Sequence, residues 1–308
     1  MILLTKNIIA TLAYYDVMEY PLTSFEVWKH FLAVENEVTR EQVSFALVHE
    51  ALTMLVKESR VKQDRGFYFL PGRALLVDQR LSEGKVSVAR LKRVKQLAAV
   101  LQFLPFIRMI GATGSLAMEK GERESDWDLL IVLKKDFIFT GRAIVTLFLH
   151  CIGKRRHGKK TKNRACLNYF ITDESLEIGM KDLYSAHEYR FLIPLFGWDI
   201  YRKFEMTNRW IVRFQPQFFL TEKPSFFLVP HNRFAARSRH FFEALFGWHF
   251  LEAKLRTWQQ GKIFRNPLSQ LEASYIEATD RALIFLPKPR GPKTFVAFRD
   301  RLATLRLL

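Results

Sequence analysis

Two aspartates on one face of a predicted strand are the residues of this chain best suited to chemistry. Asp126 and Asp128 lie two apart at the start of an apolar run, residues 129–133. Side chains two apart in an extended strand project from the same face, so the carboxylates point together and Trp127 points away. Like charges so close repel each other, and a cation between them relieves the repulsion. Mg²⁺ prefers hard oxygen ligands, often one or two carboxylates with substrate phosphates, so the pair predicts a magnesium site.

Gly114 and Ser115 precede the aspartates and suit a phosphate-binding loop. Residues 106–112 have the apolar content of a short strand, and Gly114 then allows a sharp turn and a close approach to a ligand. Ser115 is expected to open a helix whose first amides and hydroxyl face a phosphate. The segment therefore predicts a strand, a phosphate loop and a second strand that carries metal ligands.

This arrangement resembles the DNA polymerase beta-like nucleotidyltransferase superfamily. Its motif is a hydrophobic residue, then Gly followed by Gly or Ser, a short spacer, and Asp-x-Asp on a hydrophobic strand. Gly114, Ser115, Asp126 and Asp128 match this motif, whereas Thr113 replaces the hydrophobic residue. The resemblance implies that the glycine and serine hold a nucleoside triphosphate and that the two aspartates bind Mg²⁺ and serve catalysis.

The superfamily usually supplies a third carboxylate from a later strand, which is expected here at residues 165–171. The central polar residue of that run is Asn168, whose amide oxygen can ligate a metal but brings no charge and cannot act as a base. Phosphoryl transfer relies mainly on positioning and on charge neutralisation, so an enzyme with two acidic ligands stays open. A nucleotide-binding pseudoenzyme with a vestigial transferase domain is the alternative.

A basic loop, residues 154–164, precedes this third strand and holds seven Lys or Arg residues in eleven. If the fold of the superfamily holds, Lys159, Lys160 and Arg164 are candidates for contacting phosphates. The alternative is a charged surface loop with no ligand.

Residues 1–73 predict a separate winged-helix-like domain. Apolar spacing marks a helix at 6–15, and residues 21–28 form a turn and cap that begin a second helix. A capping box opens a third helix at 39–58, and a two-stranded ribbon follows at 60–70.

Such a domain can place its third helix in a DNA major groove, with Lys62 and Arg65 on the wing. The third helix carries few basic residues, so protein contact or packing within the chain is an equal alternative. A winged-helix DNA-binding regulator is therefore the rival to the transferase.

The fold class predicted for the whole chain is α+β. A linking helix at 74–100 leads to a small mixed-sheet nucleotidyltransferase domain at 101–183, and a helical region follows at 184–308. Within that region, residues 240–260 carry large apolar side chains at helical spacing, which predicts core packing or an interface.

Composition sets the outer bounds. The chain has 308 residues, a net charge of +17 and a pI near 9.9, which favours polyanionic partners such as nucleotides or nucleic acid. Its two cysteines imply no disulfide framework and no thiolate metal site. The longest apolar stretch, residues 137–153, contains Arg142 and His150, so we expect no membrane span and a cytoplasmic location.

The function that these patterns favour is a magnesium-dependent nucleotidyltransferase. It would move a nucleoside monophosphate from a nucleoside triphosphate to an acceptor that the sequence does not identify.

Overall fold

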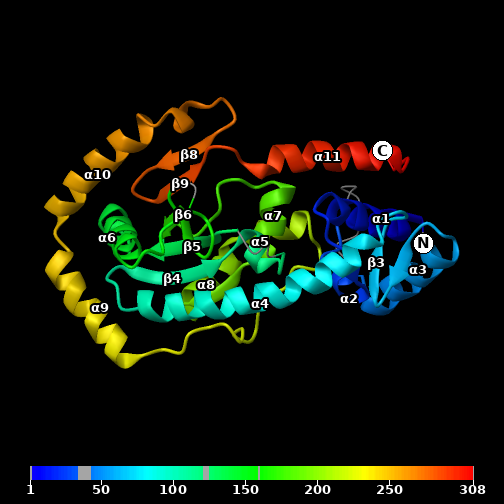
Figure 1. The fold of residues 1–308 in the computed structure, drawn as a ribbon, viewed down its shortest axis with the longest axis horizontal. Helices are drawn as coiled ribbons and strands as arrows, with labels where there is room; N and C mark the ends of the chain where they lie inside the picture. The colour runs from blue at the N-terminus through cyan, green and yellow to red at the C-terminus, as the bar shows by residue number, and fades with distance from the viewer. Residues whose placement is uncertain (1, 34–42, 121–124, 159, 308) are drawn as a thin grey trace.

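The computed structural model has a mixed α+β fold with two sheets, which confirms the predicted fold class (Figure 1). The structure describes residues 2–33, 43–120, 125–158 and 160–307. A small N-terminal domain lies at one end of an elongated molecule and the larger sheet lies towards the other (Figure 1). The long helix α4 (Leu75–Leu101) runs from one part to the other, where a linking helix was expected.

The N-terminal domain has the elements expected of a winged helix. Its three helices are followed by a hairpin, and a short extra strand completes a sheet in the order β1-β3-β2. In chain order the elements are α1 (Ile2–Val17), β1 (Leu22–Thr23), α2 (Ser24–Lys29), α3 (Phe45–Lys57), β2 (Lys62–Asp64) and β3 (Phe67–Phe69).

Local capping explains where two of these helices begin. Thr23 and Glu26 form a capping box that starts α2, as the predicted turn and cap required. Helix α3 begins at Phe45, with the Ser44 side chain accepting from the Leu47 amide. The capping box expected at residues 39–42 lies outside the described residues.

The larger sheet has six strands in the order β7-β4-β5-β6-β9-β8. Strands β5 and β6 are parallel and are joined by helix α6, whereas every other neighbouring pair is antiparallel. The strands are β4 (Ile107–Ala112), β5 (Trp127–Leu133), β6 (Ala165–Thr172), β7 (Ile193–Phe196), β8 (Tyr275–Ala278) and β9 (Ala282–Leu286).

The region at 184–308 was expected to be helical, and this expectation was incomplete because it supplies strands β7, β8 and β9. These strands have only four or five residues each and are stabilised by pairing, β7 with β4, β9 with β6 and β8 with β9. The remaining helices are α5 (Gly114–Ala117), α6 (Ile138–Cys151), α7 (Leu183–Arg190), α8 (Trp198–Thr207), α9 (Arg233–Phe246), α10 (His249–Phe264) and α11 (Arg290–Thr304).

The last helix, α11, ties the two parts of the molecule together. It starts beside the larger sheet and ends over α1 of the N-terminal domain (Figure 1). Phe298 and Leu302 are buried in the N-terminal core. The rings of Phe298 and Tyr14 pack edge to face, with their centroids 5.2 Å apart. The buried carboxylate of Asp16 in α1 accepts a hydrogen bond from Arg73 Nε at 2.7 Å and forms an ion pair with Arg301, whose Nη2 lies 3.0 Å from Asp16 Oδ2.

Removal of the Phe298 ring should therefore loosen the joint between the two parts. We expect Phe298→Ala to lower the free energy of unfolding by about 3 kcal/mol, because a buried phenylalanine leaves a cavity. The matched variant Phe295→Ala, on the same helix but 57% exposed, should change it by less than about 0.5 kcal/mol. Chemical denaturation measures both, and equal effects would contradict this packing.

Candidate functional site

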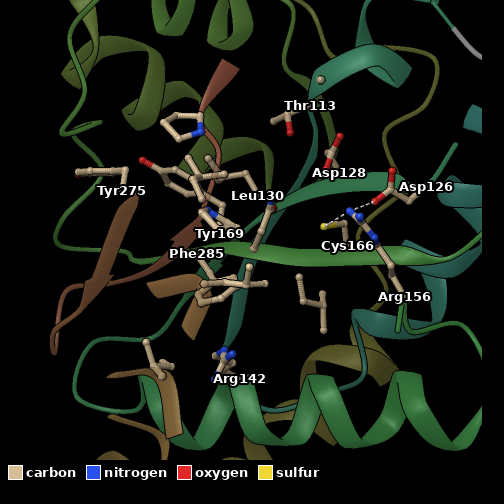
Figure 2. Close-up of a pocket in the computed structure, with 18 of the residues that line it drawn as sticks. Thr113, Asp126, Asp128, Leu130, Arg142, Arg156, Cys166, Tyr169, Tyr275 and Phe285 are labelled. Atoms are coloured by element: carbon tan, nitrogen blue, oxygen red, sulfur yellow. Dashed lines mark hydrogen bonds and ion pairs between the residues drawn. The ribbon is translucent and has the colours of Figure 1, made fainter. Parts of the chain in front are cut away.

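Asp126 and Asp128 lie together at the start of β5, as the alternation of the strand requires. Figure 2 shows both carboxylates on the same side of the strand, with Thr113 near Asp128. Trp127, between them, is buried in the core on the other side. The Thr113 amide donates to the Asp128 carbonyl at 3.0 Å, which fixes the end of β4 against the start of β5.

Gly114 is held against Asp128 by its backbone conformation. Its φ of +61° lies in the left-handed region, and a Cβ built there would lie 2.7 Å from Asp128 Oδ2. Ser115 follows in the short helix α5, but among the described residues it is Thr113 and Gly114 that line the adjacent cavity. The sequence motif thus places its glycine directly beside one carboxylate.

The position opposite Asp128 on the neighbouring strand is occupied by Cys166. Asp128 pairs with Cys166 in the parallel register, and the next pair joins Leu130 to Tyr169. Strand β6 therefore has one residue more than β5 between these pairs, a β-bulge that shifts Asn168 out of register. Asn168 lines the cavity, and Cys166 Sγ lies within 4.8 Å of carboxylate oxygens of both aspartates.

Arg156 of the basic loop bridges these groups. Its Nη1 lies 2.5 Å from Asp126 Oδ2 and donates to Cys166 Sγ at 3.4 Å (Figure 2). Asp126 is mostly enclosed, whereas Arg156 is 45% exposed, so the ion pair sits at the entrance of the site. The guanidinium offsets part of the carboxylate charge.

The loop does not place the predicted phosphate contacts as expected. Arg164 donates to the Gly153 and Arg155 carbonyls and thereby shapes the loop, and the Lys160 amide donates to the His157 carbonyl. Neither lines the cavity, and Lys159 lies outside the described residues. The loop residues that do line it are Arg155, Arg156, His157 and Gly158.

These residues open onto a cavity of about 1160 Å³, which is large enough for a nucleotide and a second ligand. The aspartates and Arg156 lie at one end, and Leu130, Tyr169, Tyr275 and Phe285 lie towards the other (Figure 2). Arg142 of α6 also lines the cavity, where its Nη1 donates to Gln259 Oε1 at 2.6 Å. The cavity therefore combines an acidic end, basic groups and an aromatic wall.

Two lining residues of the acidic end were missed in the sequence. Glu188 lies on α7 and Arg290 begins α11. The charge of Arg290 lowers the pKa of Asp128, and the charge of Asp128 raises the pKa of Glu188. Burial, and then Asp128, raise the pKa of Glu188 to about 7. No local pattern marks either residue, since each reaches the site only through tertiary packing.

The environment of Asp128 disfavours the ionised form of its carboxylate. Burial and then the neighbouring charge of Asp126 raise the pKa of Asp128 to about 6, and Arg290 and Arg156 counteract this only in part. A divalent cation between the two carboxylates would remove the repulsion, so this donor pair fits Mg²⁺.

Cys166 fits Mg²⁺ less well, because a thiol is a soft ligand. Burial and the two aspartates raise the pKa of the Cys166 thiol to about 12, which keeps it protonated. The structure thus offers two hard ligands and a neutral sulfur where the sequence suggested an amide.

No protein family, curated protein or solved structure matches the chain. Within the described part of the chain, no helix has the length and apolar character needed to cross a membrane.

Substitution of Gly114 tests its contact with Asp128. Gly114→Ala should lower the free energy of unfolding by about 2 kcal/mol, because it adds left-handed strain and pushes Cβ onto the carboxylate. Gly66→Ala, at φ +84° with nothing within 4 Å of the new Cβ, should lose only about 1 kcal/mol from strain. Urea denaturation compares them, and equal losses would show that the contact is unimportant.

The pKa of Asp128 predicts a pH-dependent effect of Asp128→Asn. The pKa of Asp128 in the folded state, about 6, exceeds its ordinary value of 3.8. Between pH 3.8 and about pH 6 the folded state therefore binds more protons than the unfolded state, so the contribution of Asp128 to stability falls as pH rises through this range. Without divalent cations, we expect the variant to be more stable than the wild type by on the order of 1 kcal/mol at pH 8. The gain should vanish below about pH 4.

Thermal unfolding across this pH range measures the difference. The control Glu222→Gln removes an exposed carboxylate and should show no such pH dependence. A wild type that is more stable than Asp128→Asn at pH 8 would contradict the assigned burial and repulsion.

Proposed function

We propose that the chain is a magnesium-dependent nucleotidyltransferase, which transfers a nucleoside monophosphate from a nucleoside triphosphate to an acceptor. The observation that carries the proposal is the convergence of Asp126, Asp128 and Gly114 at one end of a large cavity. Glycine at position 114 lets the backbone pass directly beside Asp128, where a Cβ would collide with the carboxylate, and paired carboxylates suit a metal-bound triphosphate.

Each residue has a definite role in this proposal. Gly114 and Ser115 would hold the triphosphate through backbone amides, and Asp126 and Asp128 would hold Mg²⁺. The ion would neutralise phosphate charge and align the reacting groups. Arg156 now pairs with Asp126, and once a cation takes that partner its guanidinium is free to contact a phosphate oxygen.

The reaction balances with these groups. An acceptor oxygen forms a bond to the α-phosphorus, the bond between the α-phosphorus and its bridging oxygen to the β-phosphate breaks, and pyrophosphate leaves with the electron pair. The proton of the acceptor needs a base near neutral pH. Glu188 lines the same cavity, and its pKa of about 7 suits that task.

A nucleotide-binding pseudoenzyme is the second candidate, and one observation favours it. The resemblance implies a third carboxylate from strand β6, but this strand brings the neutral Cys166 and Asn168 to the site, so the site has one negative charge fewer for metal binding. Such a protein would bind the triphosphate without turning it over.

The DNA-binding regulator draws less support from the N-terminal domain. On the wing, Arg65 forms ion pairs with Asp64 (Nε to Oδ2, 3.0 Å) and with Asp78 (Nη2 to Oδ1, 2.6 Å). These two carboxylates neutralise the guanidinium charge that a DNA phosphate would need. The exposed side chains at the start of α3 include Phe45 and Leu47. Helix α3, residues 45–57, contains a single Lys or Arg residue, Lys57, at its C-terminal end. This surface suits apolar contacts better than phosphates.

Turnover of labelled nucleoside triphosphates tests the proposal. Wild type with Mg²⁺ and a cell extract as acceptor source should release pyrophosphate, and Asp126→Asn/Asp128→Asn should reduce the rate at least about 100-fold. The control Asp199→Asn/Glu222→Gln neutralises two exposed carboxylates and should keep the wild-type rate.

The outcomes separate the two candidates. Magnesium-dependent triphosphate binding without pyrophosphate release would assign the pseudoenzyme. Release that is unchanged in Asp126→Asn/Asp128→Asn would remove these residues from the mechanism.

A further inference from the structure

Helices α9 and α10 expose an unusual number of aromatic side chains. They form the outer edge of the molecule, at the end away from the N-terminal domain (Figure 1). Phe241 and Trp248 are each 64% exposed and Phe250 is 67% exposed. We call this surface the aromatic edge, and its exposed apolar residues are Phe234, Phe241, Phe242, Leu245, Phe246, Trp248, Phe250, Trp258 and Phe264.

Core packing or an interface was expected for residues 240–260, and the exposure of Phe241, Leu245 and Trp248 excludes core packing for these side chains. Helix α9 ends at Phe246 and α10 begins at His249, so the apolar stripe bends around a corner at Gly247. Helix α9 meets the body of the protein through residues such as Ala235 and Glu243, whereas Phe234, Phe241 and Leu245 of the same helix are each at least 50% exposed. Monomeric proteins rarely leave a contiguous apolar surface of this kind without a partner.

Basic side chains lie among the exposed rings. Lys254 Nζ lies 4.3 Å from the centre of the Phe250 ring. Arg233, Arg237 and Arg265 are exposed on the same two helices or directly after them.

The two acidic residues of this segment, by contrast, face the protein. Glu243 accepts from Arg108 at 2.7 Å and from the Phe106 amide at 3.0 Å. Glu252 is buried and accepts from the amides of Phe139 and Thr140, both at 2.8 Å, which caps the start of α6. The outward face of residues 233–265 therefore presents rings and positive charge, with its carboxylates turned inward.

We propose that the aromatic edge binds the surface of an anionic phospholipid bilayer. Interfacial helices that lie on membranes combine Trp, Phe and Leu with Lys and Arg, and bind by burying rings at the headgroup level while cations meet acidic lipids. The edge has both features, and the net charge of +17 adds a long-range attraction to such a surface. This binding is peripheral and needs no membrane-spanning helix.

The charge pattern argues against a second copy of this chain as the occupant. A two-fold dimer through this edge would bring Arg237 and Lys254 of both copies into one interface, with no exposed carboxylate of the segment to pair with them. An anionic bilayer complements the same charges.

Flotation with lipid vesicles tests the proposal. The full chain should float with phosphatidylcholine vesicles that contain phosphatidylserine, bind phosphatidylcholine alone much more weakly, and dissociate as salt increases. Phe241→Ser/Trp248→Ser should weaken binding at least about tenfold, because two rings no longer insert. Phe295→Ser, an exposed ring on α11, should not.

A second pair of variants tests the charges without changing the rings. Arg237→Gln/Lys254→Gln should weaken binding to the acidic vesicles about 30-fold, since two cations at about 1 kcal/mol each are removed and about 1.4 kcal/mol corresponds to a factor of ten. The control Lys57→Gln/Lys62→Gln removes the same charge from the N-terminal domain and should have little effect.

Three results would overturn the proposal. The first is that the wild type does not float with acidic vesicles, and the second is that the edge variants and the control variants lose vesicle binding equally. The third is that the wild type self-associates but does not bind vesicles, and that Phe241→Ser/Trp248→Ser abolishes the self-association. Sedimentation velocity on the same samples detects the last of these. None of these results depends on nucleotide turnover, so the membrane proposal and the transferase proposal fail separately.

Discussion

The repulsion between Asp126 and Asp128 is the constraint around which the candidate site is built. Strand β5 holds the two carboxylates on one face, and burial raises the pKa of Asp128 to about 6. Gly114 packs against Asp128, and Arg156 bridges to Asp126. A fold that maintains such an unfavourable pair gives up stability locally, which is characteristic of sites that bind a charged ligand.

The rest of the fold keeps this end of the cavity in place. Met118, which ends α5, packs in the N-terminal core, and His187 Nε2 lies 3.1 Å from its sulfur. Arg290 lines the cavity at the start of α11, and Phe298 of the same helix is buried in that core too. The N-terminal domain therefore supports the segment around Gly114 and the cavity wall, a structural role that does not require DNA.

Local patterns predicted the parts of this site that depend on neighbouring residues. Strand alternation placed Asp126 and Asp128 together, and a cap at Thr23 predicted the start of α2. The bulge that puts Cys166 opposite Asp128 follows from pairing between strands and has no signature in β6 alone. Glu188 likewise reaches the cavity only through the packing of α7 against the sheet, so spacing along the chain could not reveal it.

A crystal structure with Mg²⁺ and a non-hydrolysable nucleoside triphosphate tests the central claim most directly. The account predicts one ion between the carboxylates of Asp126 and Asp128, phosphates against Gly114 and Ser115, and Arg156 turned from Asp126 towards a phosphate. An intact Asp126–Arg156 ion pair, with no ion bound there and the nucleotide elsewhere or absent, would contradict it.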